Sequence, residues 1–295
     1  MPEKILFDTD IGTDIDDAVC LAYLLAQPEC ELMGITTVSG EPEKRAMIAS
    51  ALCKAAKKDI PIFAGAENPL INPIIQKYAR QAEALSKWDH DEIKNNGEAI
   101  EFMRKTIREN PGEITLLAVG PLTNVALLFA ADREIPHLLK RLVLMCGAFT
   151  CNYPAVNPSE WNARNDPHAA KIVYQAPVKI HRSIGLDVTR KVVMDAEMVG
   201  EKFQVGLLRT VLDFAEVWFR ESAKIITFHD PLAAVTIFNN EVCEFSRGNV
   251  DVEIVSPKSF GFTYWRPDQE NGVHEVALKV DSNKFFEEYF SVFKK

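Results

Sequence analysis

The fold of this chain is decided by Lys4-Ile5-Leu6-Phe7-Asp8-Thr9-Asp10-Ile11-Gly12-Thr13-Asp14-Ile15-Asp16-Asp17-Ala18, a short apolar run that leads directly into five aspartates. The continuous apolar run from Ile5 to Phe7 is typical of a parallel strand buried on both faces. Gly12 lets the backbone turn tightly after this strand, and a helix is predicted over residues 18–25. Ligands of open parallel sheets bind beyond the carboxyl ends of the strands. The aspartates therefore lie where such a fold carries its functional site.

Five carboxylates so close in sequence repel one another unless something neutralises them. A hard divalent cation with oxygen ligands, either calcium or magnesium, is the simplest neutralising partner. The alternative is an acidic loop whose aspartates cap the next helix, because anionic side chains favour helix N-termini. The number of acids that follow one buried strand favours the functional interpretation.

Composition limits the partners of the chain. Its 295 residues include 33 Lys and Arg against 42 Asp and Glu, which gives a net charge of −9. Because no basic surplus is present to hold phosphates, nucleic-acid polymers are not expected as partners. The six cysteines form no Cys-x-x-Cys pair and are expected as buried free thiols. Without an apolar leader or a membrane-length apolar stretch, we expect a cytoplasmic protein with no membrane partner.

Strand and helix patterns alternate along most of the chain. Repeated βα units predict an α/β fold, with an open, mainly parallel, Rossmann-like sheet and helices on both faces. Residues 149–165 are expected as a loop, residues 242–280 as a small β extension near the C-terminus, and residues 1–295 as a single domain. The other expected strands are 32–38, 60–64, 114–119, 142–145 and 178–185, and the other expected helices are 42–57, 79–87, 99–109, 122–131, 166–174, 207–226, 232–238 and 285–293.

Three further polar groups fall where strands end or helices begin. The turn Val119-Gly120-Pro121-Leu122-Thr123-Asn124 is positioned to aim a carbonyl at the same edge as Asp10, or is an ordinary strand-to-helix turn. In Glu160-Trp161-Asn162, an acid and an amide two residues apart can grip hydroxyl groups, although a solvated loop has the same composition. In His229-Asp230-Pro231, the aspartate is either a helix N-cap or a fourth oxygen ligand beside the acidic cluster, with the histidine as candidate proton donor.

This ordered set of motifs resembles a known family, the inosine-uridine-preferring nucleoside hydrolases. The resemblance runs in family order over nearly the whole chain, as far as Val280-Asp281. Its motifs are Asp8-Thr9-Asp10 with Gly12 and Asp16-Asp17-Ala18, Ile35-Thr36-Thr37-Val38, Gly120-Pro121-Leu122-Thr123-Asn124, Val143-Leu144-Met145, Glu160-Trp161-Asn162 with Asp166-Pro167, Gly185-Leu186-Asp187-Val188-Thr189, and His229-Asp230-Pro231.

The resemblance implies an enzyme that hydrolyses the N-glycosidic bond of ribonucleosides to ribose and free base, with a bound calcium ion. The calcium ligands that it implies are Asp10, Asp17, Asp230 and the main-chain carbonyl of Val119. Asp10 is also implied as general base on a calcium-bound water, and His229 is implied to face the leaving base. The implied substrate contacts are Asp16 and Asn162 for the 2′- and 3′-hydroxyls, Glu160 for the 5′-hydroxyl, Met145 in the sugar pocket, Trp161, and Asn152 or Asn157. Because the family forms dimers or tetramers, a homo-oligomer is expected.

The chain departs from the family pattern at several positions. Thr13-Asp14-Ile15 stands where the family has one residue, which leaves Asp14 and Asp16 as alternatives for the ribose-binding position. The asparagine that the family has after Thr-Thr-Val-x-Gly is Glu41 here, and the phenylalanine between its Glu and Asn is Trp161. A His-Gly segment that the family often carries beside the base is missing from residues 68–91. The base preference therefore stays open.

Two other functions are compatible with the residues. Asp8-x-Asp10 after a strand also suits a magnesium-dependent phosphohydrolase that uses Asp8 as nucleophile. That function gives no role to His229-Asp230 or to Glu160-x-Asn162. A nucleoside- or sugar-binding protein without turnover is the other alternative, because the residues usual on the base side are absent.

Overall fold

The sheet at the centre of the molecule carries the N-terminal strand in its interior. The computed structural model describes residues 1–94, 96–150 and 159–293. In this part of the chain, nine strands form one sheet in the order β10-β9-β11-β6-β5-β4-β1-β2-β3. All neighbours from β11 to β3 are parallel, while β9 pairs antiparallel with β11 and β10. Their bounds are Glu3–Thr9 (β1), Cys30–Thr37 (β2), Ile62–Ala64 (β3), Ile114–Ala118 (β4), Arg141–Leu144 (β5), His181–Ser183 (β6), Cys243–Val252 (β9), Thr263–Pro267 (β10) and His274–Val280 (β11).

β1 is buried on both faces, as its apolar run predicts. Ile5 and Phe7 pack into the core on one side of the sheet, and Leu6 packs into the core on the other side. β2 and β4 flank the strand, so that Asp8 lies between Thr36 and Ala118. The predicted fold class, a mainly parallel α/β sheet with helices on both faces and a C-terminal β extension, is confirmed.

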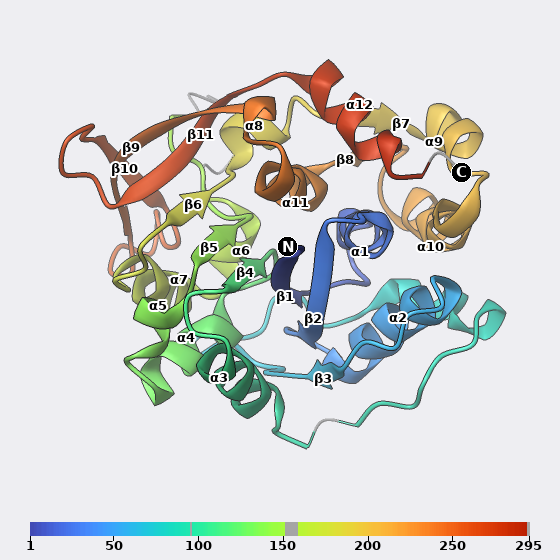
Figure 1. Ribbon diagram of the computed structural model, residues 1–295, viewed down its shortest axis with the longest axis horizontal. Coiled ribbons are helices and arrows are strands. Elements are labelled where there is room, and N and C mark those ends of the chain that lie inside the picture. Colours follow the sequence, from blue (N-terminus) through green and yellow to red (C-terminus); the bar gives the residue numbers. More distant parts are fainter. Residues whose placement is uncertain (95, 151–158, 294–295) are drawn as a thin grey trace.

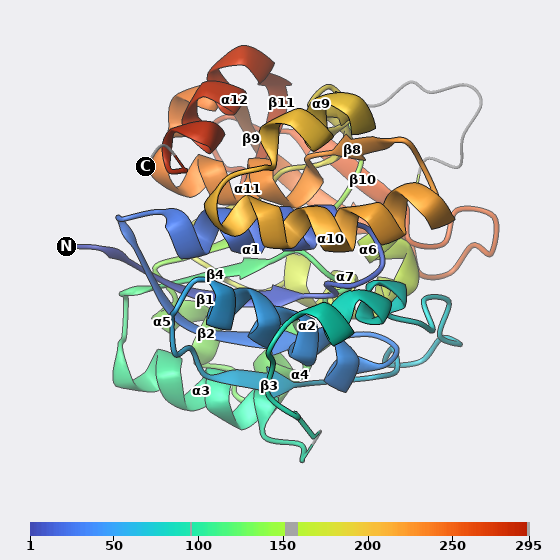
Figure 2. The same ribbon diagram turned by 90° about the vertical axis from the view of Figure 1, so that its right-hand side faces the viewer.

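Helices cover the sheet in two layers. α1, α2, α10, α11 and α12 pack on one face, and α3, α4 and α7 on the other (Figures 1 and 2). Among the described residues the helices are Asp16–Ala26 (α1), Pro42–Ala55 (α2), Ala99–Glu109 (α3), Thr123–Ala131 (α4), Ile135–Leu138 (α5), Trp161–Asn165 (α6), Pro167–Tyr174 (α7), Leu186–Thr189 (α8), Ala196–Lys202 (α9), Gly206–Glu221 (α10), His229–Phe238 (α11) and Ser282–Ser291 (α12), with 3-10 turns at Arg80–Lys87 (η1) and Asn240–Val242 (η2).

Several stretches differ from the sequence prediction. Residues 79–87, expected as a helix, contain the 3-10 turn η1, and α5, α8 and α9 were not predicted. The expected helix over residues 207–226 ends at Glu221, because Ile225–Thr227 (β8) pairs antiparallel with Val193–Asp195 (β7) in a separate two-stranded sheet. The expected loop over residues 149–165 contains α6. The carboxylate of Glu160 caps this short helix by accepting from the backbone N–H groups of Asn162 and Ala163, which replaces the missing intrahelical partners.

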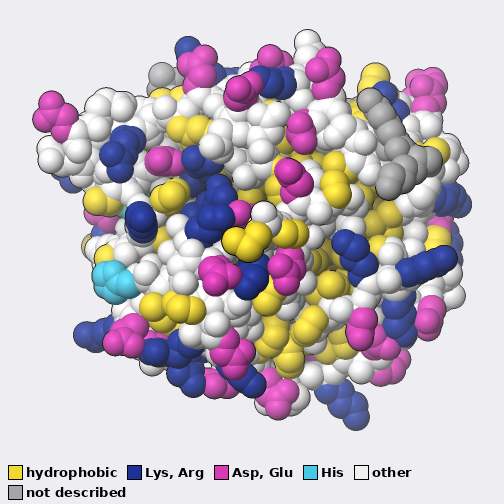
Figure 3. Space-filling view, viewed as in Figure 1, with side chains coloured by type: hydrophobic (Ala, Val, Ile, Leu, Met, Phe, Trp, Pro, Cys, Tyr) yellow, Lys and Arg dark blue, Asp and Glu magenta, His cyan; other side chains and the backbone are white. Residues whose placement is uncertain are grey.

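The surface carries mixed charges, and the described thiols agree with the sequence prediction. Acidic and basic side chains are interspersed on the face shown in Figure 3. Cys20, Cys30, Cys53, Cys146 and Cys243 are buried free thiols, as expected, and Cys151 lies outside the described residues. Among the described residues, the structure contains no helix with the length and apolar character that a membrane span requires.

A pair of buried histidines joins the parallel part of the sheet to its C-terminal extension. His181 on β6 lies opposite His274 on β11, with the ring centroids 4.7 Å apart. His181 also stacks on Tyr174 and hydrogen-bonds to the carbonyl of Val173. Burial, reinforced by His274, lowers the pKa of His181 to about 3. The ring is therefore neutral in the folded protein at neutral pH.

This burial predicts acid sensitivity of the fold. The folded pKa lies below the unfolded value of about 6.5, so the stabilising contribution is fully present above about pH 6.5 and is lost as the pH falls toward about 3. As the pH falls from about 7.5 to about 5.5, His181 alone should lower the free energy of unfolding by about 1.4 kcal/mol, because the ring takes up a proton in the unfolded state. His181→Phe should reduce the loss measured by urea unfolding by that amount. The same substitution at exposed His137 is the control, and an unchanged loss in His181→Phe would contradict the prediction.

Candidate active site

A cavity of about 410 Å³ lies at the carboxyl ends of the central strands. Asp10, Val119 and Met145, which line it, follow β1, β4 and β5 directly. The chain runs from β1 to β2 on one side and places β4 on the other, so this point is a topological switch of the sheet. The cavity size falls in the range of about 300–1,000 Å³ that is usual for small-molecule sites.

The cavity brings together most of the residues that the sequence analysis selected. Asn152 and its alternative Asn157 lie outside the described residues. The selected residues that line the cavity are Asp10, Asp16, Asp17, Val119, Met145, Glu160, Trp161, Asn162, His229 and Asp230. Asp14, the alternative to Asp16, lines it as well. Thr13, Gln76, Leu186, Trp218 and Ser222 line it in addition and were not selected for a role.

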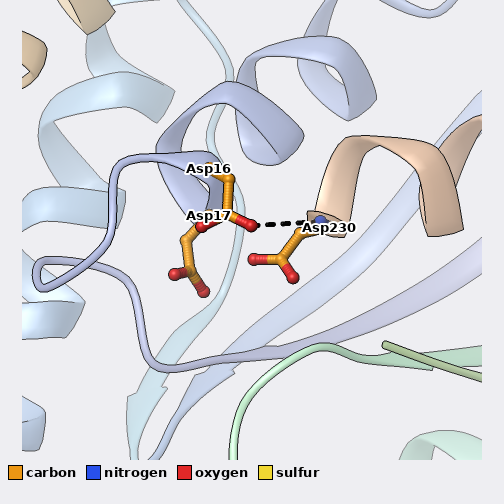
Figure 4. Close-up of side chains that lie close together, drawn as sticks. All are labelled: Asp16, Asp17 and Asp230. Atoms are coloured by element: carbon orange, nitrogen blue, oxygen red, sulfur yellow. Dashed lines mark hydrogen bonds between the residues drawn. The ribbon is translucent and has the colours of Figure 1, made fainter. Parts of the chain in front are cut away.

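Three carboxylates converge on one point. Asp16 and Asp17 stand at the start of α1, and Asp230 stands at the start of α11, whose N-terminus faces that of α1 (Figure 4). One oxygen of each lies within 4.8 Å of the other two. The Asp16 carboxylate also accepts a hydrogen bond of 3.2 Å from the backbone N–H of Asp230 (Figure 4). Two helix N-termini therefore direct partial positive charge at the three acids.

The charge of these acids needs a counterion. Burial, and then repulsion among neighbouring aspartates, raises the pKa of Asp16, Asp17 and Asp230 well above the usual value. Each is at most 3 % exposed, so water does little to stabilise the charged forms. Hard oxygen donors gathered at this spacing suit a divalent cation such as calcium. The residues present therefore fit a metal ion, and the cluster could bind one.

Asp10 lies in the same cavity but outside this trio. One of its carboxylate oxygens accepts a hydrogen bond of 2.6 Å from the Gln76 amide. Its main-chain carbonyl accepts a hydrogen bond from Arg45. Burial raises the pKa of Asp10, and the positive charge of Arg45 and the Gln76 hydrogen bond oppose that rise. Asp10 also interacts with Asp17, so it lies beside the trio although it is not one of the three.

Arg45 is a fully buried cation behind the cavity. It projects from α2 and also donates to the carbonyls of Ile11 and Gly40, so that it fixes the turn after β1. Its positive charge stabilises the ionised forms of Asp10 and Asp17 and so opposes the rise of their pKa values. The sequence analysis missed this residue, although Arg45 stands three positions before the apolar Ile48 on the inner face of α2, which was a usable signal.

The segment around α6 holds the opposite wall. Both carboxylate oxygens of Glu160 accept hydrogen bonds from backbone N–H groups. Oε1 accepts from Asn162, and Oε2 accepts from Ala163 and Gly147. The Asn162 side-chain amide donates to the carbonyls of Val119, at 2.5 Å, and Met145, at 3.0 Å. α6 is therefore tied to the ends of β4 and β5, which places its acid and amide at the cavity.

His229 and two tryptophans complete the cavity. Nδ1 of His229 lies 2.7 Å from the hydroxyl of Thr189. Burial, with a smaller effect of Arg190, lowers the pKa of His229 to about 4, so the ring is neutral at neutral pH. Trp161 is 45 % exposed at the cavity, and Trp218 comes from α10, which sequence periodicity could identify only as a helix.

Asp8 lies behind the cavity rather than in its wall. It is fully buried and accepts hydrogen bonds from Thr36 and Asn124. Burial raises its pKa to about 7. A nucleophile must reach its substrate, and Asp8 does not line the cavity, so the geometry argues against the phosphohydrolase alternative.

Comparison with known sequences points to one family. The sequence model of the inosine-uridine preferring nucleoside hydrolases matches residues 5–287. The chain is 31% identical to a pyrimidine-specific ribonucleoside hydrolase of Citrobacter koseri, over 89% of this chain and 88% of that protein. It is 29% identical to uridine nucleosidase 1 of Arabidopsis thaliana, over 85% of this chain and 78% of that protein.

Solved structures agree on the fold. A purine-preferring ribonucleoside hydrolase from Gardnerella vaginalis superposes with a TM-score of 0.85 at 21% identity, over 99% of this chain and 98% of that one. The family match covers nearly the whole chain and includes every described acid of the cavity. The chain therefore belongs to the inosine-uridine preferring nucleoside hydrolase family, and it is a hydrolase that acts on N-glycosyl compounds.

Proposed function

We propose that this enzyme hydrolyses the N-glycosidic bond of ribonucleosides to ribose and free base. The observation that carries the proposal is the convergence of Asp16, Asp17 and Asp230, with Asp10 in the same cavity. Departure of the base leaves positive charge on the sugar, in an oxocarbenium-like state. Buried carboxylates stabilise that charge more strongly than water does, so the acidic cavity suits this bond cleavage.

We further propose calcium as the metal, held by Asp10, Asp17, Asp230 and the carbonyl of Val119. The carbonyl of Val119 accepts from Asn162, but a carbonyl oxygen has a second lone pair for a ligand. When bound, the ion would offset the repulsion among the acids, lower the pKa of a bound water and help to orient the ribose hydroxyls.

The remaining roles belong to the chain's own side chains. Asp10 takes the proton of the attacking water as general base. Asp16 and Asn162 bind the 2′- and 3′-hydroxyls, Glu160 binds the 5′-hydroxyl, and Met145 packs against the sugar. Trp161 and one of the asparagines 152 and 157 complete the substrate contacts. The support for this arrangement is that each described residue among them lines one cavity.

His229 is proposed to donate a proton to the leaving base. A neutral imidazole carries one N–H. If the hydroxyl of Thr189 donates a hydrogen bond to Nδ1, the single ring proton of His229 is on Nε2. Nε2 then remains available to donate that proton to the base. A departing base that gains a proton is a better leaving group, so the role matters most for bases that leave poorly.

Two broader proposals concern the whole protein. We propose that residues 1–295 form a single domain, because one sheet takes strands from both ends of the chain, from Glu3 to Val280. We also propose that it acts in the cytoplasm, a reducing compartment in which its five described free thiols would persist.

A reducing-sugar assay over a panel of ribonucleosides tests the activity and the metal together. Ribose should be released from at least one nucleoside. Treatment with a calcium chelator should stop the release, and added calcium should restore it. Restoration by magnesium but not by calcium would contradict the choice of ion. Nucleoside binding without any ribose release would indicate a binding protein instead.

Asp10→Asn should lower kcat by about 10²–10⁴-fold, because the amide cannot accept the proton of the water. Steady-state kinetics on the best nucleoside of the panel measure the effect. Asp213→Asn is the matched control, since Asp213 is also 6 % exposed and pairs with Lys87 and Arg209 on the protein surface. Near-normal turnover by Asp10→Asn would refute the general-base role.

His229→Ala should lower kcat on natural nucleosides by about 10²-fold or more and should affect an activated nitrophenyl riboside much less. Nitrophenolate leaves without a proton, whereas a nucleobase needs one. The comparison of the two substrates separates proton donation from a general disturbance of the cavity. Equal losses on both substrates would exclude His229 as the donor.

A further inference from the structure

Gln76 is a buried amide in direct contact with Asp10. Its side chain is 5 % exposed and lines the cavity. Nε2 donates a hydrogen bond of 2.6 Å to the Asp10 carboxylate and another of 3.0 Å to the hydroxyl of Thr13. Oε1 accepts a hydrogen bond of 2.5 Å from the indole N–H of Trp161. Both ends of the amide are therefore engaged.

These partners fix which way the amide points. The Asp10 carboxylate only accepts hydrogen bonds when it is ionised, and the indole N–H of Trp161 only donates them. A flipped Gln76 amide would set oxygen against oxygen at Asp10 and N–H against N–H at Trp161. The order from Trp161 through Gln76 to Asp10 is thus the one arrangement in which each of these contacts is a hydrogen bond.

The backbone of Gln76 is held as firmly as its side chain. Its carbonyl accepts from the N–H of Gly40, at 3.2 Å, and from the hydroxyl of Ser39, at 3.3 Å. The two segments run so close that a Cβ on Gly40 would lie 2.5 Å from the Gln76 carbonyl oxygen. The N–H of Ala79, three residues on, is bound by the Glu41 carboxylate at 2.9 Å. The amide is therefore presented from an anchored segment.

Asp10 needs such an anchor. It shares the cavity with four other carboxylates that repel it: Asp14, Asp16, Asp17 and Asp230. Arg45 hydrogen-bonds to its main chain, which fixes the backbone but leaves the side-chain rotamer to other contacts. The hydrogen bond from Gln76 acts on the carboxylate itself.

We propose that Gln76 is a positioning residue for the hydrolysis proposed above, on which this inference rests, and that it holds the Asp10 carboxylate in the orientation that takes the proton of the attacking water. With Oδ2 hydrogen-bonded to Gln76, the proton of the water moves to Oδ1 while the water oxygen forms the new bond to the sugar carbon. The bond from that carbon to the base breaks, and the base leaves with the bonding electrons and takes a proton from His229. Trp161 acts one step further out, by holding Gln76. Neither Gln76 nor the indole N–H is required to exchange a proton.

Three variants test the inference by their effect on kcat and KM. Gln76→Leu removes all three side-chain hydrogen bonds at similar size and should lower kcat by about 10–100-fold, with KM changed by less than about threefold, as expected for a misplaced catalytic group. Gln76→Glu is nearly isosteric but places acceptors against Asp10, so it should lower kcat at least as much. Trp161→Phe keeps a ring and removes the N–H donor, so it should lower kcat less, by about 3–10-fold.

Gln27 provides the matched control. It is also 5 % exposed, donates to the hydroxyl of Tyr23 and does not line the cavity. In Gln27→Glu the Tyr23 hydroxyl can turn from acceptor to donor, whereas in Gln76→Glu the ionised Asp10 cannot. Gln27→Leu and Gln27→Glu should therefore keep kcat within about twofold of wild type. Thermal unfolding of all five variants identifies any that do not fold.

The Gln76 and Trp161 series has outcomes that decide the question. A fall in kcat in Gln76→Leu, Gln76→Glu and Trp161→Phe, in folded proteins with nearly unchanged KM, supports positioning. A rise in KM alone, or a Gln76→Glu enzyme as fast as wild type, overturns it. If Gln76→Leu does not fold, Trp161→Phe decides by the same criterion. Ribose release by wild type that is lost in Asp10→Asn upholds the proposed function whatever the Gln76 variants do, and an inactive wild type defeats both proposals.

Discussion

Mutual repulsion of buried carboxylates is the constraint on which this structure depends. Asp10, Asp14, Asp16, Asp17 and Asp230 share one cavity, and burial raises the pKa of every one of them. Three features of the fold reduce this repulsion. The N-termini of α1 and α11 direct partial positive charge at Asp16, Asp17 and Asp230. The buried guanidinium of Arg45 lies behind the turn. The hydroxyl of Thr9 donates a hydrogen bond to the Asp17 carboxylate. The charge that remains is what a bound cation could neutralise.

The same charge explains the chemistry. A cavity rich in carboxylates stabilises a sugar that becomes positive as its base leaves, and the effect is strong because these carboxylates are buried. The wall that faces the acids is different in kind, since α6 supplies an amide and an acid whose positions are set by backbone hydrogen bonds. A sugar ring in this cavity would have hydrogen-bond acceptors, the aspartate carboxylates, on one side. On the other side it would have the amide and the carboxylate that α6 holds in place. The switch point of the sheet brings both sides to one place.

The fold and the acids could be predicted from the sequence because each leaves a local pattern. The run from Ile5 to Phe7 identified β1, and α3 has the bounds that its periodicity indicated. The five residues of α6 are too few for a helical period, and the end of α10 depends on the pairing of β8 with a distant strand. Gln76 could not be found, since it lies in a segment without periodicity and its role comes entirely from tertiary contacts with Asp10 and Trp161.

Asp10 and the trio of Asp16, Asp17 and Asp230 reach the same cavity from different elements of the fold. Oxygens of Asp16, Asp17 and Asp230 lie within 4.8 Å of one another, close enough to share a cation but too close for each to titrate alone. Asp10 follows β1 directly, whereas the trio stands on two helix starts, and the turn at Gly12 lies between Asp10 and the two acids of α1. Gly12 has a φ of 115°, which side chains rarely tolerate, and a Cβ there would also lie 2.8 Å from Ile48. The glycine that shapes this turn thereby lets Asp10 and the two acids of α1 reach one cavity.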